Sequence, residues 1–141
     1  MLVKEIMTRE VITVSPDDSL KNVGEILKEK RISGLPVVKD EKIVGIITLT
    51  DMLKVLERIY KWKELEKREP GLALSEMFEK EKVDAKVKDF MSKEVLTLNE
   101  NDTIEEVMKL MFARGIHTLP VVKEDKLVGI VGKRDLVYAC F

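Results

Sequence analysis

GLPVVKDEKIVGIITLTD at residues 34–51 returns 84 positions later as TLPVVKEDKLVGIVGKRD at residues 118–135. The similarity continues without a gap over residues 6–53 and 90–137, where 17 of 48 aligned positions are identical. Self-similarity at one fixed offset indicates a duplicated structural unit, and this offset exceeds the period of a solenoid repeat. Each copy is too small to bury a large core alone, so the sequence predicts two units in a pseudo-symmetric pair.

Each copy predicts the same order of elements. A short run of β-branched residues, at 11–14 and again at 95–98, favours a strand. A polar break follows, and then a helix with apolar residues along one face, capped by Ser19 in the first copy and Thr103 in the second. Two apolar runs across four polar residues predict a hairpin, after which Asp51 can cap a final helix. The fold class is therefore α+β, built from tandem β-α-β-β-α units.

The composition argues against several classes of protein. Basic and acidic residues nearly cancel, 25 against 26, which disfavours a duplex nucleic-acid partner. No apolar run reaches the roughly 18 residues of a membrane span, and the first residues have no signal-peptide core, so we expect a cytoplasmic protein. The lone Cys140 cannot form an internal disulfide. Enrichment in Lys and Glu, with no Gln, indicates a thermophilic source, and a highly charged surface on a mesophile protein is the alternative.

The segment between the copies is predicted to be largely helical. Residues 52–69 carry an amphipathic stripe at i, i+3 and i+4 spacing, and a shorter amphipathic piece covers residues 75–82. The stripe either packs on its own module or forms a dimer or partner surface, which Tyr60 and Trp62 favour because aromatic residues are enriched at interfaces. The predicted domains are residues 1–69, a linker with a short helix at residues 70–86, and residues 87–141.

Taken together, the two copies resemble a pair of CBS (cystathionine β-synthase) domains, known as a Bateman module. The resemblance covers residues 7–53 and 91–137 and rests on a V-x-x-[IF]-M lead-in, an LPVV strand, and a VG-I strand whose glycine precedes an aspartate by six residues. It implies two units packed sheet to sheet about a pseudo-twofold axis, with up to two clefts between them. It also implies AMP, ADP, ATP or S-adenosylmethionine as regulatory ligand, no required cofactor, and a homodimer.

The stretch from Gly45 to Asp51 is similar to the ribose-phosphate motif of that family. A carboxylate can accept two hydrogen bonds from adjacent ribose hydroxyls, and the hydroxyls of Thr48 and Thr50 can donate to phosphate. The helix N-terminus beside them favours an anion. The alternative is that Asp51 and its counterpart Asp135 only cap helices, since Asp is a preferred capping residue.

The second copy departs from this motif at two positions. Gly132 removes its first hydroxyl, and Arg134 replaces the second with a guanidinium, which can bind phosphate bidentately. The two clefts should therefore differ, and we expect the Arg134 side to prefer ligands with more phosphate. His117 aligns with Ser33 and resembles a phosphate-contacting position in regulatory subunits of the AMP-activated kinase, although a purely structural histidine is the alternative.

The adenine is expected to lie against apolar strand residues, although such residues usually belong to the core. Thr13 and Thr97 are further candidates, because a hydroxyl inside an apolar strand invites a polar partner. No second His or Cys lies at metal-ligand spacing and no acid–base pair is organised, so we expect neither a metal site nor an enzyme. The predicted ligand-binding residues are Thr13, Val14, Ser33, Pro36, Ile46, Thr48, Thr50, Asp51, Thr97, Leu98, His117, Pro120, Ile130, Arg134 and Asp135.

The sequence thus predicts an adenine-nucleotide sensor that signals to a separate effector protein. A ligand can shift a conformational equilibrium only by binding one state better than the other. One alternative is a ligand-free dimerisation scaffold, for which the loss of a hydroxyl at Gly132 is the best support. Another is a module associated with single-stranded nucleic acid, to which Lys80, Lys82, Lys86 and Lys88 would contribute and whose binding would depend strongly on salt.

Overall fold

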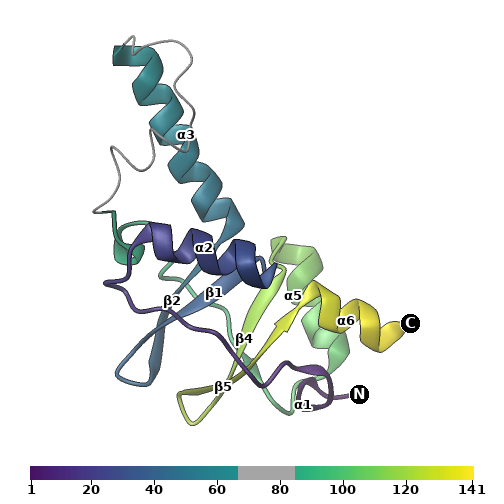
Figure 1. Cartoon of the computed structure of the whole chain (residues 1–141). Coiled ribbons are helices and arrows are strands. Elements are labelled where there is room, and N and C mark those ends of the chain that lie inside the picture. The colour runs from purple at the N-terminus through teal and green to yellow at the C-terminus, as the bar shows by residue number, and fades with distance from the viewer. Residues whose placement is uncertain (67–84) are drawn as a thin grey trace.

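The computed structural model describes residues 1–66, with residues 62–66 as backbone only, and residues 85–141 (Figure 1). Within these ranges both copies contain a hairpin flanked by two main helices, which confirms the predicted α+β fold of tandem units. The elements are α1 (Val3–Ile6), α2 (Leu20–Lys30), β1 (Gly34–Lys39), β2 (Lys42–Thr48), α3 (Leu49–Glu66), the 3-10 helix η1 (Val87–Asp89), β3 (Leu98–Asn99), α5 (Ile104–Arg114), β4 (Thr118–Lys123), β5 (Lys126–Gly132) and α6 (Lys133–Cys140).

The hairpins β1–β2 and β4–β5 have the same register and the same irregularity, which follows Val37 in one and Val121 in the other. Each closes through a two-residue turn with φ values of 52° and 66°, and positive φ at both central residues is what a type I′ hairpin turn requires. Among the described residues the hairpins join in one sheet of order β1-β2-β5-β4-β3, through the pairing of Lys42 with Lys126. The duplication therefore extends from the sequence to the backbone conformation.

The strands expected before the polar breaks are shorter than predicted. In the first copy only Val14 reaches the sheet, in a bridge with Val37, and in the second copy the strand is the two-residue β3. The predicted extent of both strands was wrong because the earlier residues of each run leave the sheet. Val11 and Val95 instead line the cavities that are described below.

The two lead-in segments cross to the opposite copy. Thr8 forms a bridge with Ile130 of the second copy, and Ser92, 84 positions after Thr8, forms the equivalent bridge with Ile46 of the first copy. In both bridges the two backbone hydrogen bonds measure 2.9–3.0 Å. Exchanging the copies converts one bridge into the other, which is the pseudo-twofold relation that the repeat predicts.

This crossing completes the two hydrophobic clusters found among the described residues. Val87 of the second lead-in is fully buried with Leu35 and Ile47 of the first copy. Val3 of the first lead-in is fully buried with Leu119 of the second copy. Because each cluster needs the apolar lead-in segment of the other copy, neither copy is self-sufficient.

The glycine of the VG-I strand is explained by the same crossing. A Cβ atom on Gly45 would lie 2.6 Å from Sδ of Met91, and one on Gly129 would lie 2.6 Å from Sδ of Met7. Both methionines end a lead-in segment. The glycine and the methionine of the repeated motif are therefore two sides of one close contact, since glycine allows the backbones to approach.

Helix α3 confirms the helix predicted after the first copy and extends well beyond the sheet (Figure 1). Of the predicted stripe, Val55 and Ile59 are buried against the first cluster and Met52 packs partly against it. Leu56 is at the edge of the buried face, with 36% of its surface exposed. The side chain of Trp62 and the helix predicted at residues 75–82 lie outside the described residues.

Candidate functional site

Two cavities lie between the copies in the part of the chain that the structure describes, with volumes of about 680 Å³ and about 420 Å³. The larger cavity is bounded by the first lead-in, α2 and the start of α6, and the smaller one by the second lead-in, the start of β4 and the start of α3. Thr8 and Asp135 in the larger cavity correspond to Ser92 and Asp51 in the smaller one. Both volumes suit a small organic ligand, and the pseudo-twofold relation extends to the cavities.

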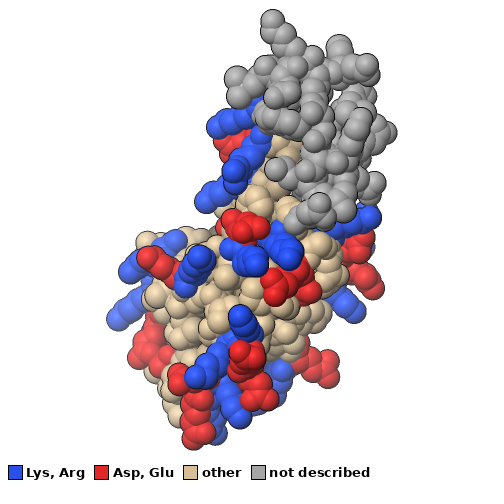
Figure 2. All heavy atoms as spheres, turned by 90° about the vertical axis from the view of Figure 1, so that its left-hand side faces the viewer, with Lys and Arg blue, Asp and Glu red and all other residues tan. Residues whose placement is uncertain are grey.

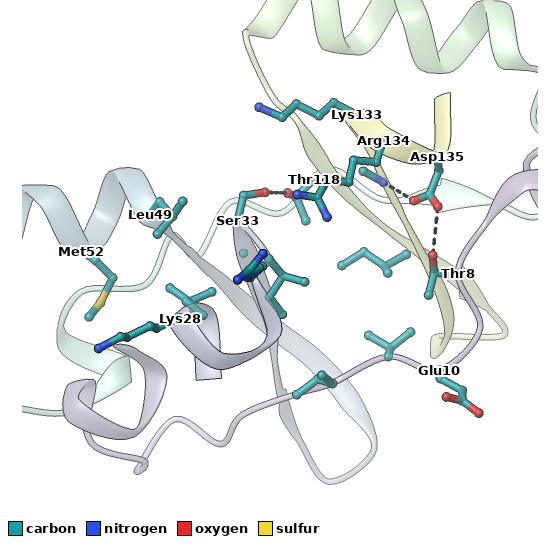
Figure 3. Close-up of a pocket in the computed structure, with 18 of the residues that line it drawn as sticks. Thr8, Glu10, Lys28, Ser33, Leu49, Met52, Thr118, Lys133, Arg134 and Asp135 are labelled. Atoms are coloured by element: carbon teal, nitrogen blue, oxygen red, sulfur yellow. Dashed lines mark hydrogen bonds between the residues drawn. The ribbon is translucent and has the colours of Figure 1, made fainter. Parts of the chain in front are cut away.

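In the larger cavity, Asp135 connects the start of α6 to the opposite copy. Its Oδ2 accepts a hydrogen bond from the backbone N–H of Gly132 at 2.8 Å, and its Oδ1 accepts one from Oγ1–H of Thr8 at 3.0 Å. Figure 3 shows Asp135 pointing toward Thr8, while the Arg134 side chain extends toward Ser33 and Thr118. A carboxylate and a guanidinium from adjacent residues thus face different parts of one cavity.

In the smaller cavity, Asp51 forms a compact set of bonds with Thr48. Its Oδ2 accepts from the backbone N–H of Thr48 at 2.8 Å and from the Thr48 hydroxyl at 3.1 Å, and the same hydroxyl accepts from the N–H of Asp51 at 3.3 Å. Oδ1 of Asp51 has no hydrogen-bond partner among the described residues. This oxygen can accept a bond from a ligand hydroxyl without breaking the helix start.

The position of the helix caps corrects the sequence-based expectation. The N-cap residues are Thr48 and Gly132, and the aspartates occupy the third helical position. A carboxylate at that position reaches back to the backbone N–H of the N-cap residue, as in a capping box. The expectation that the aspartates themselves cap the helices was therefore wrong by three residues, and their structural role is compatible with a second role in the cavities.

The two cavities differ in charge. Of the described residues that line the larger cavity, four are cationic and two are carboxylates. Around the smaller cavity, the described residues include the carboxylates of Asp51 and Glu94 against the single cation of Lys133, together with His117. Cavity walls of one prevailing sign create a potential of that sign, so the lining of the larger cavity is the more positive of the two.

A thin wall separates the cavities. Ser33, Leu49, Thr118 and Lys133 line both of them. Within this wall, Oγ of Ser33 and Oγ1 of Thr118 form a hydrogen bond of 3.2 Å between the copies, and Thr118 is 8% exposed. The repeat places His117 opposite Ser33 and Gly34 opposite Thr118, so this bond has no symmetry equivalent.

The structure brings most, but not all, of the predicted ligand residues to the cavities. Val14 and Leu98 are buried in the two clusters, Pro36 and Pro120 are buried in strands, and Thr13 and Thr97 are exposed. These six line neither described cavity, and they stay predictions. The larger cavity includes Ser33, Ile130, Arg134 and Asp135, and the smaller includes Ser33, Ile46, Thr48, Thr50, Asp51 and His117.

Several lining residues were missed from the sequence. Glu10 and Glu94 occupy the same position in both copies, so the internal alignment could have identified them. The same holds for Thr8 and Ser92, the hydroxyl residues that directly follow the lead-ins. Lys28 and Arg31 carry no such signal, since only the packing of α2 brings them to the larger cavity.

Comparison with known proteins agrees with this geometry. The family profile of the CBS domain matches residues 3–58 and 87–141. The inosine-5′-monophosphate dehydrogenase of Methanocaldococcus jannaschii is 37% identical over 135 residues, which cover 94% of this chain and 22% of the dehydrogenase. The chain therefore belongs to the CBS-domain family and contains a pair of these domains.

Two solved structures of CBS-domain proteins are similar over almost the whole chain. CBSX2 in complex with AMP has a TM-score of 0.75 and 26% identity, covering 99% of this chain and 95% of that one. The CBS domain pair of protein MJ0100, in complex with 5′-methylthioadenosine and S-adenosyl-L-methionine, has a TM-score of 0.78 and 26% identity, with both chains fully covered. Neighbours of this fold thus bind adenosine compounds.

The chain spans 22% to 46% of the length of four of the curated relatives that it matches. Within residues 1–66 and 85–141, no helix is long and apolar enough to cross a membrane. The same residues contain no group of three or more His, Cys, Asp or Glu side chains that could hold a metal ion.

Proposed function

We propose that this CBS pair is a regulatory module that binds adenosine-containing ligands in the two cavities between its copies. The observation that carries the proposal is the repeated placement of an aspartate in both cavities, Asp135 in the larger and Asp51 in the smaller. A carboxylate held at a helix start by its own backbone is preorganised to accept hydrogen bonds from vicinal ribose hydroxyls. AMP, ADP, ATP and S-adenosylmethionine are the ligands proposed here.

The ligand would report to a partner by changing the relation between the copies. Each cavity is lined by both copies, and the lead-in segments end at the cavities. A ligand that bridges the copies stabilises the arrangement that it binds better, and only that difference can shift the population. The output passes to a separate effector protein, and we propose no reaction at either cavity.

We also propose a homodimer, in which the exposed stripe of α3 takes part. Leu53 and Tyr60 have 64% and 54% of their surfaces exposed and lie about two helical turns apart. An apolar stripe on a projecting helix suits an interface. Light scattering should show a dimer that Leu53→Glu dissociates and Lys54→Glu does not.

Isothermal titration calorimetry tests the proposed ligands. We expect saturable binding of at least one adenosine compound by the full chain. Asp51→Asn and Asp135→Asn should each weaken binding about tenfold, since hydrogen bonds to charged groups contribute at this level. Asp125→Asn is a matched control, because Asp125 lies in an exposed hairpin turn away from both cavities. Equal affinities in all three variants, or no binding by the parent chain, would contradict the proposal.

The charge distribution argues against the nucleic-acid alternative. Figure 2 shows basic and acidic side chains interspersed over the face that it presents, without a continuous basic stripe. A basic stripe along one face is the usual electrostatic footprint of a nucleic-acid-binding surface. Two of the four lysines considered for that role, Lys80 and Lys82, lie outside the described residues.

A further inference from the structure

We infer that the two cavities select ligands by charge. The larger cavity takes a nucleoside polyphosphate, and the smaller one takes a nucleoside without phosphate, whose 5′ substituent is neutral or cationic. The inference rests on the proposed binding of adenosine compounds and adds a distinct chemical class for each cavity. It concerns this chain in particular, because it follows from positions at which the two copies differ.

Positively charged side chains from two helices, α2 and α6, line the larger cavity. Lys28 and Arg31 come from the last turn and the C-cap of α2, while Lys133 and Arg134 come from the first turn of α6. Of the two carboxylates, Asp135 already accepts hydrogen bonds from Gly132 and Thr8 at its two oxygens. A chain of phosphates can lie between these two sets of cations, and a guanidinium can bind phosphate through two parallel N–H donors.

Three of those four cations line only the larger cavity, and their counterparts in the other copy are uncharged. The counterparts of Lys28, Arg31 and Arg134 are Phe112, Gly115 and Thr50. Lys133 remains, but it lines both cavities, and in this one the carboxylates of Asp51 and Glu94 outnumber it. A polyphosphate entering here would meet two carboxylates and one shared cation, and like charges at close range disfavour binding.

The hydroxyl at Thr48 does not compensate for the missing cations. Its single O–H donates to Oδ2 of Asp51 at 3.1 Å, and its oxygen accepts from the N–H of the same residue. The sequence suggested this hydroxyl as a phosphate donor, but its proton is engaged within the helix start. Oδ1 of Asp51, which has no partner among the described residues, and the carboxylate of Glu94 are acceptors. They match ligand hydroxyls and cationic groups rather than phosphate oxygens.

Both cavities can be occupied at once. The hydrogen-bonded pair of Ser33 and Thr118 forms part of the wall between them, and the aspartates lie in different cavities. A ligand in one cavity therefore does not displace a ligand in the other. This separation allows the two chemical classes to be measured in a single protein.

Calorimetry with ATP and adenosine as probes tests the inference. ATP should bind at one site per chain, and adenosine should still bind to the ATP-saturated protein in the other cavity. If ATP fills both cavities with similar affinity, or displaces adenosine completely, the inference is overturned while the proposed function stands. If neither compound binds, the proposed function fails and the inference fails with it.

A charge substitution in the smaller cavity provides a gain of binding that an unfolding artefact cannot imitate. Glu94→Lys should create a second ATP site and should weaken a cationic probe, S-adenosylmethionine, about tenfold. Glu10→Lys, the matched change in the larger cavity, should leave the number of ATP sites at one. An unchanged stoichiometry in the Glu94→Lys protein, with adenosine binding retained, would overturn the inference.

The converse substitution removes charge from the larger cavity. Arg134→Gln should weaken ATP about tenfold while leaving adenosine unchanged, because a charge-assisted bond to phosphate is lost and the smaller cavity is untouched. Arg114→Gln, on the exposed end of α5 and outside both cavities, is the control. Equal ATP affinity in Arg134→Gln and Arg114→Gln would contradict the assignment of polyphosphate to the larger cavity.

Discussion

The larger and smaller cavities are built on the same backbone conformation, but the charged side chains that line them differ. Their aspartates, their lead-in bridges and the hairpins behind them coincide under the 84-residue repeat. Their charged side chains do not, since Lys28 and Arg31 have no cationic counterparts in the second copy. The repeated positions that build this backbone are buried or hydrogen-bonded, and the cations that distinguish the cavities lie at positions where the copies differ. Packing therefore constrains the backbone, whereas the lining can change without loss of the fold.

The start of the last helix differs in the same way. At α3, the Thr48 hydroxyl caps an N–H, while at α6 the N-cap Gly132 provides no side-chain hydrogen bond. In compensation, Asp135 is hydrogen-bonded to Thr8 in the opposite copy, while the equivalent Ser92 donates to the backbone oxygen of Glu94 at 3.4 Å. The larger cavity is thus connected across the copies at a point where the smaller one is open.

Truncation of equivalent leucines in the two hydrophobic clusters should have the largest effect, and it tests whether the two copies contribute equally to stability. Leu35 and Leu119 are equivalent and fully buried, one in each cluster. Leu35→Ala and Leu119→Ala should each lower the free energy of unfolding by about 2–5 kcal/mol, through lost transfer energy and the cavity left behind. Chemical denaturation followed by circular dichroism measures both. A cost confined to one variant would show that the copies do not contribute equally.

The second-largest loss of stability is expected at Gly45 and Gly129, the glycines that lie against the methionines of the lead-in segments. Gly45→Ala and Gly129→Ala should each cost about 1–3 kcal/mol, because the new methyl group would overlap a methionine sulfur at 2.6 Å. Combining Gly45→Ala with Met91→Ala should recover part of the loss by removing that sulfur. Thermal unfolding of the single and double variants measures this, and a strictly additive double variant would contradict the contact.

Loss of the hydrogen bond between Thr8 and Asp135 should lower stability more than the equivalent change at the smaller cavity. Thr8→Val removes the hydroxyl donor and leaves Oδ1 of Asp135 without that partner, so we expect a loss of about 0.5–1.5 kcal/mol. Ser92→Ala, the matched change, should have a smaller effect, because the Ser92 hydroxyl forms a long bond to a backbone oxygen. Equal losses measured by denaturation would remove this distinction between the cavities.

The smallest effect concerns an exposed ion pair between the second lead-in and the first copy, at positions whose counterparts, Lys4 and Asn101, cannot form one. Nζ of Lys88 lies 3.2 Å from Oδ1 of Asp17. The hydrogen bond and the positive charge of Lys88 hold the pKa of the Asp17 carboxyl below its ordinary value of 3.8. A lowered folded-state pKa contributes stability above the unfolded value, and this is lost as the pH falls through the folded one. Lys88→Met should therefore destabilise the protein slightly at about pH 7 and not at about pH 2.

Thermal unfolding at both pH values checks this, and Lys4→Met is the control. Lys4 is the counterpart of Lys88, and the counterpart of Asp17 is Asn101, which has no carboxylate to titrate. A pH-dependent effect in Lys4→Met of the same size would show that the ion pair is not its source. Exposed pairs contribute little, so the measurement needs replicate scans.

The elements and the pairing of the copies were predictable, while the partners of the lead-ins were not. Local patterns predicted α2, α3 and both hairpins, because helix periodicity and turn residues are short-range signals. The strand predicted at residues 11–14 was too long, since its residues alternate like a strand but Val11 and Ile12 line a cavity instead. The crossing of Met7 and Met91 has no local signal, although its glycine contacts explain why both are repeated.

By itself the sequence determined the duplication, the fold class, the family and the aspartates of the candidate site, because these depend on spacings that repeat along the chain. Only the tertiary structure decided that each lead-in completes the opposite core, that the proton of the Thr48 hydroxyl is already engaged, and that α2 adds Lys28 and Arg31 to one cavity. The physical reason is that a cavity between two packed units is lined by side chains from distant segments. Which side chains meet at such a cavity depends on tertiary packing, and local sequence patterns do not predict it.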